Sequence, residues 1–179
     1  LRIGREAEVR IPEGTIYEPT FVRPGRGEAP QADSGVVVLS PAYRFFDPAT
    51  PLFRAVEVTL RARVPRPLQL HAQLAVRTRR GSLACVGGAY ADGAVTASVR
   101  TAGDLVIVAD TLPPAIRPLF AQGADLTRTE GVRFRASDNF SGIASWTLHI
   151  DGEWVPCDRF PMKGTLVHFF DAPPQRRTH

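Results

Sequence analysis

The chain holds four histidines and two cysteines, the side chains best suited to bind a metal or act as nucleophiles. None of His71, His149, His168 and His179 stands in an H-x-H or H-E-x-x-H motif. A hydrolytic zinc site needs three protein ligands and one open position. His168 and Asp171 are three residues apart, a spacing that directs them to opposite faces of a strand. We therefore expect surface imidazoles, no metal site and no cofactor.

No nucleophile motif is present either. The chain has no G-x-S-x-G sequence, the turn that exposes a catalytic serine. Cys85 follows an apolar run, and Cys157 is predicted to be buried, where a thiol has a raised pKa and behaves as a small hydrophobe. Gly87-Gly88 lacks the lysine of a phosphate-binding loop. We assign no catalytic residue and expect that this chain alone is not an enzyme.

The segment Ser137-Asp138-Asn139-Phe140-Ser141-Gly142 is rich in oxygen-bearing side chains. One interpretation is a calcium site, since carboxylate and amide oxygens bind this ion. The other is a tight turn, which these residues favour through side-chain to backbone hydrogen bonds and positive φ. We favour the turn.

Arginine dominates the positive charge. The chain has 22 basic and 18 acidic residues, a net charge of +4, and Lys163 as its only lysine. An acidic partner, such as nucleic acid or an anionic envelope polymer, is one interpretation. A solvated surface is the other, and the mixing of both charge signs favours it. Arg61/Arg63 and Arg77/Arg79 would form a basic patch if their strands were neighbours, but no aromatic residues interleave with them, so we expect no nucleic-acid binding.

The elements that carry these residues are predicted to be strands. Alternation of apolar and polar residues predicts half-buried strands at Val56–Val64, Leu68–Val76 and Val95–Val99, whereas Val36–Leu39 and Leu105–Ala109 are apolar on both faces. Sixteen prolines argue against a helical fold. No apolar run approaches the roughly 18–20 residues of a membrane-spanning helix. Short strands with frequent turns predict an all-β fold of two consecutive, Ig-like β-sandwich domains.

A proline-containing linker, Asp110–Pro114, separates the two predicted domains. The first spans residues 1–110 and the second residues 111–179. In the second domain, Val132, Phe134 and Ala136 alternate with polar residues, and further strands are expected at Ala144–Ile150, from Glu153, and at Thr165–Phe170. These make about five strands, where an Ig-like sandwich needs about seven, so we expect the second domain to be incomplete at its C-terminus. Because the chain begins at Leu1, we expect a fragment of a longer protein.

The pair Asp151-Gly152 predicts a two-residue hairpin turn, because a type I′ turn requires positive φ at both central residues. This turn sets the register, so that His149 lies opposite Trp154 and Leu148 lies opposite Val155. Cross-strand partners share a face. We therefore predict that Trp146, Leu148, Val155 and Cys157 belong to the core. His149 and Trp154 should lie together on the outer face, as a candidate binding or docking surface.

Several phrases of the chain recur together in one known group of proteins. They are Ile11-Pro12-Glu13-Gly14-Thr15-Ile16-Tyr17, Gly87-Gly88-Ala89-Tyr90, Gly103-Asp104, Asp110-Thr111-Leu112-Pro113-Pro114, Ser137-Asp138-Asn139 with Ser141-Gly142, and Ile150-Asp151-Gly152-Glu153-Trp154-Val155. In this order they resemble the C-terminal β-sandwich region of Gram-negative envelope proteins that carry a lysostaphin-type zinc peptidase domain. The Ile-Pro-x-Gly opening also occurs in ZU5-like modules.

The resemblance to the peptidase-bearing envelope proteins implies a location in the cell envelope, periplasmic or exported. The catalytic H-x-x-x-D and H-x-H pairs of that family are absent from this chain, so no catalytic residue is carried over. We expect a non-catalytic accessory region that positions a peptidoglycan-cleaving zinc metallopeptidase or contacts cell wall or other domains of the same protein. The alternative is an adhesin-like or glycan-binding module of a surface protein without peptidase activity.

Overall fold

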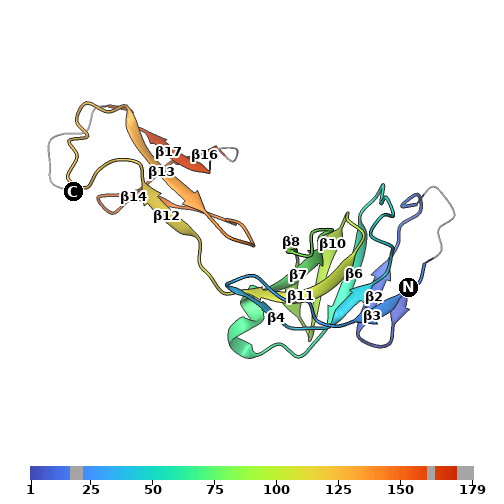
Figure 1. Ribbon diagram of the computed structural model, residues 1–179. Helices are drawn as coiled ribbons and strands as arrows, with labels where there is room; N and C mark the ends of the chain where they lie inside the picture. The colour runs from blue at the N-terminus through green and yellow to red at the C-terminus, as the bar shows by residue number, and fades with distance from the viewer. Residues whose placement is uncertain (17–21, 161–163, 173–179) are drawn as a thin grey trace. The chain divides into compact units, whose positions relative to one another are not determined.

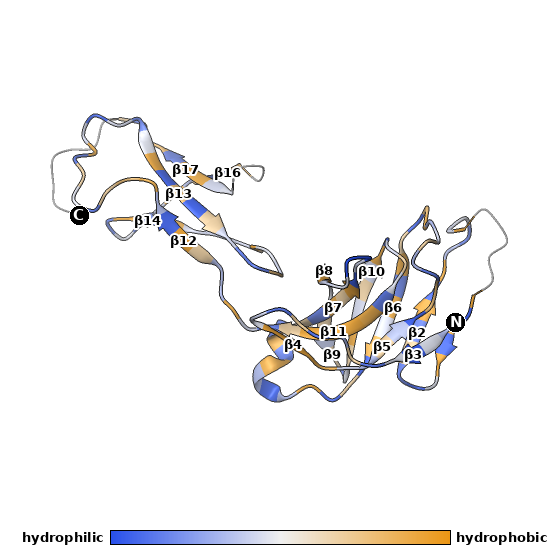
Figure 2. Ribbon diagram, in the orientation of Figure 1, coloured by the Kyte–Doolittle hydropathy of each residue, from blue (hydrophilic) through white to orange (hydrophobic). Residues whose placement is uncertain are grey.

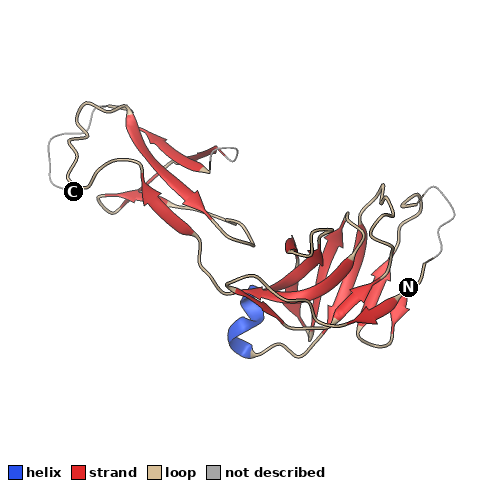
Figure 3. Cartoon of the chain, viewed as in Figure 1, coloured by secondary structure: helices blue, strands red, loops and turns tan. Residues whose placement is uncertain are grey.

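The computed structural model describes residues 1–16, 22–160 and 164–172. Tyr17, Lys163 and His179, all named above, lie outside the described residues. The chain divides into two compact units, Leu1–Leu112 and Pro113–His179. Almost every regular element is a strand, and all described pairings are antiparallel (Figure 3). The prediction of an all-β fold is therefore confirmed.

Two sheets build the first unit (Figure 1). The first has the order β1-β2-β6-β10-β9, with bounds Arg2–Ile3, Ala7–Arg10, Val56–Arg61, Ala94–Val99 and Ala89–Ala91. The second has the order β3-β5-β11-β7-β8, with bounds Gly25–Gly27, Ala42–Arg44, Asp104–Asp110, Ala72–Arg77 and Leu83–Gly87, and β4 (Val36–Val38) also pairs with β11.

The core of this unit combines inward-facing residues of both sheets. Val58, Leu60 and Val95 of the first sheet and Leu74 and Ile107 of the second are completely buried in one cluster. Strands β6 and β10 alternate between buried and more exposed residues, as their sequences predicted. All residues of β11 are buried, which confirms that it is a central strand.

The predicted strand at Leu68–Val76 is wrong in its first half. Arg66–His71 forms a short 3₁₀ helix, η1, and the strand β7 begins only at Ala72. Leu70, placed on the apolar face by the alternation, is 96% exposed. Two prolines explain why a helical turn forms here instead of a strand: Pro65 is the N-cap residue of η1, and Pro67 lies in its first turn. Their fixed φ suits a helical turn, and they lack the N–H that a ladder requires.

The predicted strand at Val36–Leu39 is shorter than expected, and only part of it is buried on both faces. β4 ends at Val38, and the side chain of Val37 is 40% exposed. Ser40 and Pro41 then connect β4 to β5, and both strands pair with β11. A run of three valines thus indicated a strand but did not reveal that one of its faces is open.

The second unit has a four-stranded sheet and a hairpin. The sheet order is β12-β13-β17-β16, with bounds Ala115–Pro118, Gly131–Ser137, Thr165–Phe169 and Asp158–Phe160. The hairpin consists of β14 (Leu148–Ile150) and β15 (Glu153–Val155). Val132, Ala136 and Leu166 are buried on one face of the sheet. The predicted strand at Ala144–Ile150 is thus shorter than expected and begins at Leu148.

Candidate binding surface

The hairpin of the second unit has the predicted turn and register. Asp151 and Gly152 have φ of 54° and 84°, as a type I′ turn requires. His149 lies opposite Trp154, Leu148 opposite Val155, and Ile150 opposite Glu153. The hairpin register derived from the sequence is therefore confirmed.

The two candidate binding residues lie on one face of this hairpin. Trp154 is 65% exposed, and His149 is also exposed. Leu148 and Val155, on the opposite face, are half-buried. The hairpin therefore presents an indole and an imidazole side by side to solvent. Such a pair can stack on a planar or apolar ligand face and donate hydrogen bonds at its rim.

Trp146 is not the core residue that the sequence predicted, since it is 37% exposed. Its Nε1 donates a hydrogen bond to the carbonyl of Cys157 at 2.9 Å, and the Arg159 guanidinium lies 5.4 Å from the ring centroid. The hairpin ladder ends at Leu148 and Val155. Trp146 is therefore not paired with the opposite strand, and the hairpin register does not place its side chain in the core. An indole N–H needs a partner when it is covered, and the backbone of Cys157 supplies it at the margin of the unit.

Cys157 itself is half-buried and free. Burial is the main cause that raises the pKa of its thiol, which makes the reactive thiolate scarcer. The thiol of Cys85 donates a hydrogen bond to Oε1 of Gln73, with 3.1 Å between Sγ and Oε1. Within the described ranges 1–16, 22–160 and 164–172, no three His, Cys, Asp or Glu residues gather as a metal site would require.

His168 departs from the expectation of a surface imidazole, since it is only 8% exposed. Its Nδ1 lies 2.7 Å from the carbonyl of Pro156, and its ring meets Phe170 edge-on with 5.3 Å between centroids. His168 lies opposite Val132 of β13, on the buried face of the sheet. Its position two residues from Leu166 on the same face was the signal that could have indicated burial.

The Ser137–Gly142 segment forms the turn that we favoured over a calcium site. Oδ1 of Asp138 accepts hydrogen bonds from the backbone N–H groups of Phe140, at 2.8 Å, and Gly142, at 2.7 Å. Gly142 has a φ of 83°. The carboxylate therefore organises the local backbone through its own hydrogen bonds.

The two arginine pairs named in the sequence do not form a common patch. Arg61 ends β6 in the first sheet and Arg77 ends β7 in the second, so the two strands are not hydrogen-bonded neighbours. Arg77 instead makes an ion pair with Asp104, whose other carboxylate oxygen lies 2.5 Å from Nε of Arg44. Sequence reasoning missed this cluster, because its three members come from distant parts of the chain.

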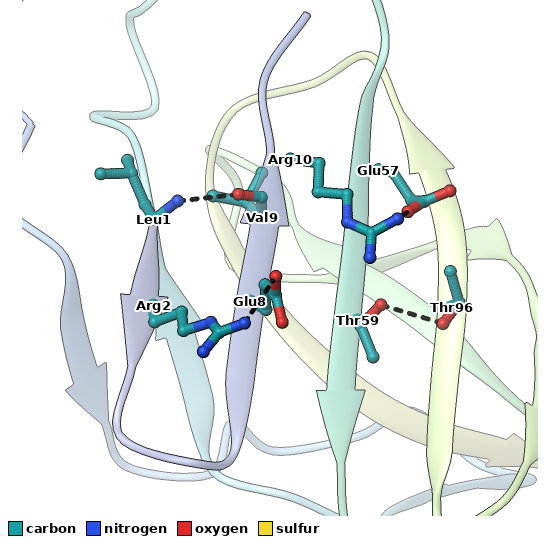
Figure 4. Close-up of polar contacts among 8 residues, drawn as sticks. All are labelled: Leu1, Arg2, Glu8, Val9, Arg10, Glu57, Thr59 and Thr96. Atoms are coloured by element: carbon teal, nitrogen blue, oxygen red, sulfur yellow. Dashed lines mark hydrogen bonds and ion pairs between the residues drawn. The ribbon is translucent and has the colours of Figure 1, made fainter.

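The outer face of the first sheet is polar, and two of its arginines are paired with glutamates. Arg2 lies 3.3 Å from Glu8 and Arg10 lies 3.2 Å from Glu57, while the hydroxyls of Thr59 and Thr96 are 3.0 Å apart (Figure 4). A shallow depression on this face is lined by Arg10, Pro12, Ala55, Glu57, Thr96, Ala97 and Ser98. Arg10, the cation that lines the depression, is paired with Glu57, so the depression itself has no unbalanced charge to attract a ligand, although Arg61 on the same face makes no ion pair among the described residues.

These observations define the first unit as an antiparallel β-sandwich domain. Comparison with known families then identifies it further: residues 4–110 match the Zu5-like domain, and the chain belongs to the Zu5-like domain family. Comparisons with curated proteins and with solved structures gave no match. Within the described residues, no helix has the length and apolar character needed to cross a membrane.

Proposed function

We propose that this chain is a non-catalytic accessory region of a cell-envelope protein, and that it positions a peptidoglycan-cleaving zinc peptidase through the Trp154–His149 surface. One observation carries the proposal: Trp154 is 65% exposed and lies beside His149 on the outer face of the hairpin. An exposed indole leaves a large apolar area in water, and proteins commonly cover such area with a partner or ligand.

The link to a peptidase comes from the resemblance of the chain's ordered phrases to the C-terminal region of such envelope proteins. The Zu5-like match over residues 4–110 supports a β-sandwich module and leaves the partner open. Periplasmic or exported localisation, and contact with cell wall or with other domains of the same protein, belong to this proposal.

A second candidate function is an adhesin-like or glycan-binding module without a peptidase. The same exposed indole favours it, because sugar rings stack on aromatic faces. The two candidates differ in the rest of the protein: a peptidase requires an H-x-x-x-D and an H-x-H set in the same gene product, which its full sequence would reveal.

The binding experiment measures retention of the purified chain on insoluble peptidoglycan sacculi. Trp154→Ala and His149→Ala are compared with Leu70→Ala, which removes a 96% exposed side chain from the first unit. We expect Trp154→Ala to weaken retention about fivefold, the effect of roughly 1 kcal/mol at a contact residue. Equal retention by all variants contradicts a cell-wall role for this surface.

A further inference from the structure

The sheet of the second unit has a face that carries three arginines. Residues that are directly opposite in an antiparallel pair share a face. Arg117 of β12 lies opposite Arg135 of β13, and Arg133 of β13 lies opposite Val167 of β17. Since Arg133 and Arg135 are two residues apart on one strand, all three arginines point to the same side. We call this side the arginine face.

The three arginines of the arginine face are open to solvent, whereas Val167, which lies opposite Arg133 on the same side of the sheet, is buried. On the opposite side, Val132, Ala136 and Leu166 are buried. Figure 2 shows the resulting alternation of blue and orange along β13. No ion pair of Arg117, Arg133 or Arg135 occurs among the residues that the structure describes.

This arrangement is unfavourable for the free protein. Like charges that are directly opposite on neighbouring strands destabilise a sheet, and Arg117 and Arg135 are such a pair. Asp158 is on the same face, but Val167 lies between it and Arg133 in the ladder. An anionic ligand that spans the arginines would remove the repulsion, and guanidinium groups bind carboxylate or phosphate in two-point geometry.

Apolar side chains lie among the arginines. Leu119 donates its backbone N–H to the carbonyl of Arg133, so it continues the β12 side of the ladder, and Phe169 lies opposite Gly131, the residue two before Arg133. Leu119 is 47% and Phe169 is 50% exposed. The ligand that fits this face therefore has anionic groups alternating with apolar faces.

We propose that the arginine face binds a polyanionic glycan, a linear sugar polymer with carboxylate or phosphate groups. The anions of such a polymer pair with the arginines, and the C–H faces of its sugar rings pack on Phe169 and Leu119. The three arginines and the two apolar side chains are spread over neighbouring strands on one side of the sheet, an arrangement that fits a polymer lying across the strands.

The surface is distinct from Trp154 and His149, which lie on the separate hairpin, so it extends the proposed function without depending on it. The experiment measures binding of the whole chain to polygalacturonate, a carboxylate-bearing glycan, by isothermal calorimetry at several salt concentrations. The test variant is Arg117→Gln/Arg133→Gln/Arg135→Gln. The matched control, Arg61→Gln/Arg63→Gln/Arg79→Gln, removes the same charge from exposed sites of the first unit.

We expect the test variant to raise Kd at least tenfold, as the loss of three ion pairs of moderate strength would. The control should raise Kd less than about threefold, and salt should weaken the test variant less than the wild type. Equal losses in the two variants would show that only net charge matters and would overturn the proposal. Absence of binding by the wild type would also overturn it.

Two further measurements distinguish other ligands and a purely structural role. Arginine-dependent binding to phosphatidylglycerol vesicles or to single-stranded oligo-dT, without binding to polygalacturonate, contradicts the glycan assignment. Arg117→Gln alone should raise the thermal midpoint of the second unit while weakening glycan binding, because it removes a like-charge pair. A variant that loses both stability and binding argues for a structural role and against the proposal.

Discussion

Asp104 is a buried carboxylate held between two arginines from neighbouring strands. It is 6% exposed, and its oxygens pair with Arg44 of β5 and Arg77 of β7. The hydrogen bond from Arg44 is the largest cause that holds the pKa of Asp104 below its usual value, in opposition to burial. The cluster therefore connects three adjacent strands through one ionised group.

Asp104→Asn should lower the free energy of unfolding at pH 7 by about 1–3 kcal/mol, because both arginines are partly exposed and screened. A depressed native pKa means that this stabilisation is present above the unfolded pKa of about 3.9 and is lost as pH falls through the native pKa. Urea denaturation at pH 7 and pH 3 measures it. The difference in the free energy of unfolding between wild type and Asp104→Asn should be smaller at pH 3 than at pH 7. The control Glu28→Gln, at an exposed site, should leave the free energy of unfolding unchanged at both pH values. A constant difference at both pH values contradicts this account.

At the scale of elements, Ser40 links two strands that share one edge of β11. Its hydroxyl accepts a hydrogen bond from the backbone N–H of Ile107 at 2.8 Å and lies 2.9 Å from the carbonyl of Pro41, to which it donates. The side chain thus supplies an acceptor for a backbone donor of β11 at the break between β4 and β5. A buried unpaired N–H is costly.

Ser40→Ala should destabilise the first unit by about 1–3 kcal/mol through that unpaired donor. Differential scanning calorimetry should show a lowered midpoint of several degrees for a domain of this size, roughly 4–8 °C per kcal/mol. Ser98→Ala, on the exposed side of β10, serves as the control. Equal midpoints for the two variants would indicate that Ile107 finds another acceptor.

Gly131 sets how closely β13 and β17 approach in the second unit. A Cβ added there would lie 2.1 Å from the carbonyl oxygen of His168, so the backbone must move. Gly131→Ala should cost at least the 1–3 kcal/mol typical of overpacking. Both tryptophans of the chain, Trp146 and Trp154, are in this unit, so their fluorescence in a urea titration reports its stability. In the control Gly25→Ala, the added Cβ meets no atom within 4 Å, so the urea midpoint of the second unit should be unchanged. An unchanged urea midpoint for Gly131→Ala would contradict the close approach of β13 and β17.

At the scale of the whole molecule, each unit has its own hydrogen-bonded sheets. Among the described residues, the sheets of Leu1–Leu112 include no strand of Pro113–His179. The buried cluster of Val58, Leu60, Leu74 and Ile107 likewise belongs to the first unit. A domain with a complete core can fold alone. The first unit therefore contains within itself the contacts that its core requires.

A fragment of residues 1–112 should fold by itself and unfold cooperatively. Burial and the hydrogen bond to Glu6 raise the pKa of Tyr43 to about 12, and this shift provides a sensitive probe. Spectrophotometric titration of the fragment should show one tyrosine that ionises only near pH 12, as in the full chain, because Tyr43 and Glu6 are both retained. Ionisation of every tyrosine near pH 10 would show that the fragment has lost the native sandwich.

Local features of this protein could be predicted from short stretches of its sequence. Alternation predicted β6, β10 and β13, and the Asp151-Gly152 pair predicted the turn and the His149–Trp154 pairing, because strand period and turn φ are properties of a few consecutive residues. Alternation failed at Leu68–Leu70, where Pro65 and Pro67 favour a 3₁₀ turn over a ladder.

Contacts between distant parts of the chain could not be predicted in this way, because they depend on strand order. The Arg44–Asp104–Arg77 cluster depends on the strand order β5-β11-β7, and the arginine face depends on the pairing of β12 with β13. For the same reason, Trp146 was expected in the core but is exposed, and His168 was expected at the surface but is buried. The burial of a side chain depends on which residues pack against it. Neither its hydrophobicity nor its spacing in the sequence specifies which distant strand provides those residues.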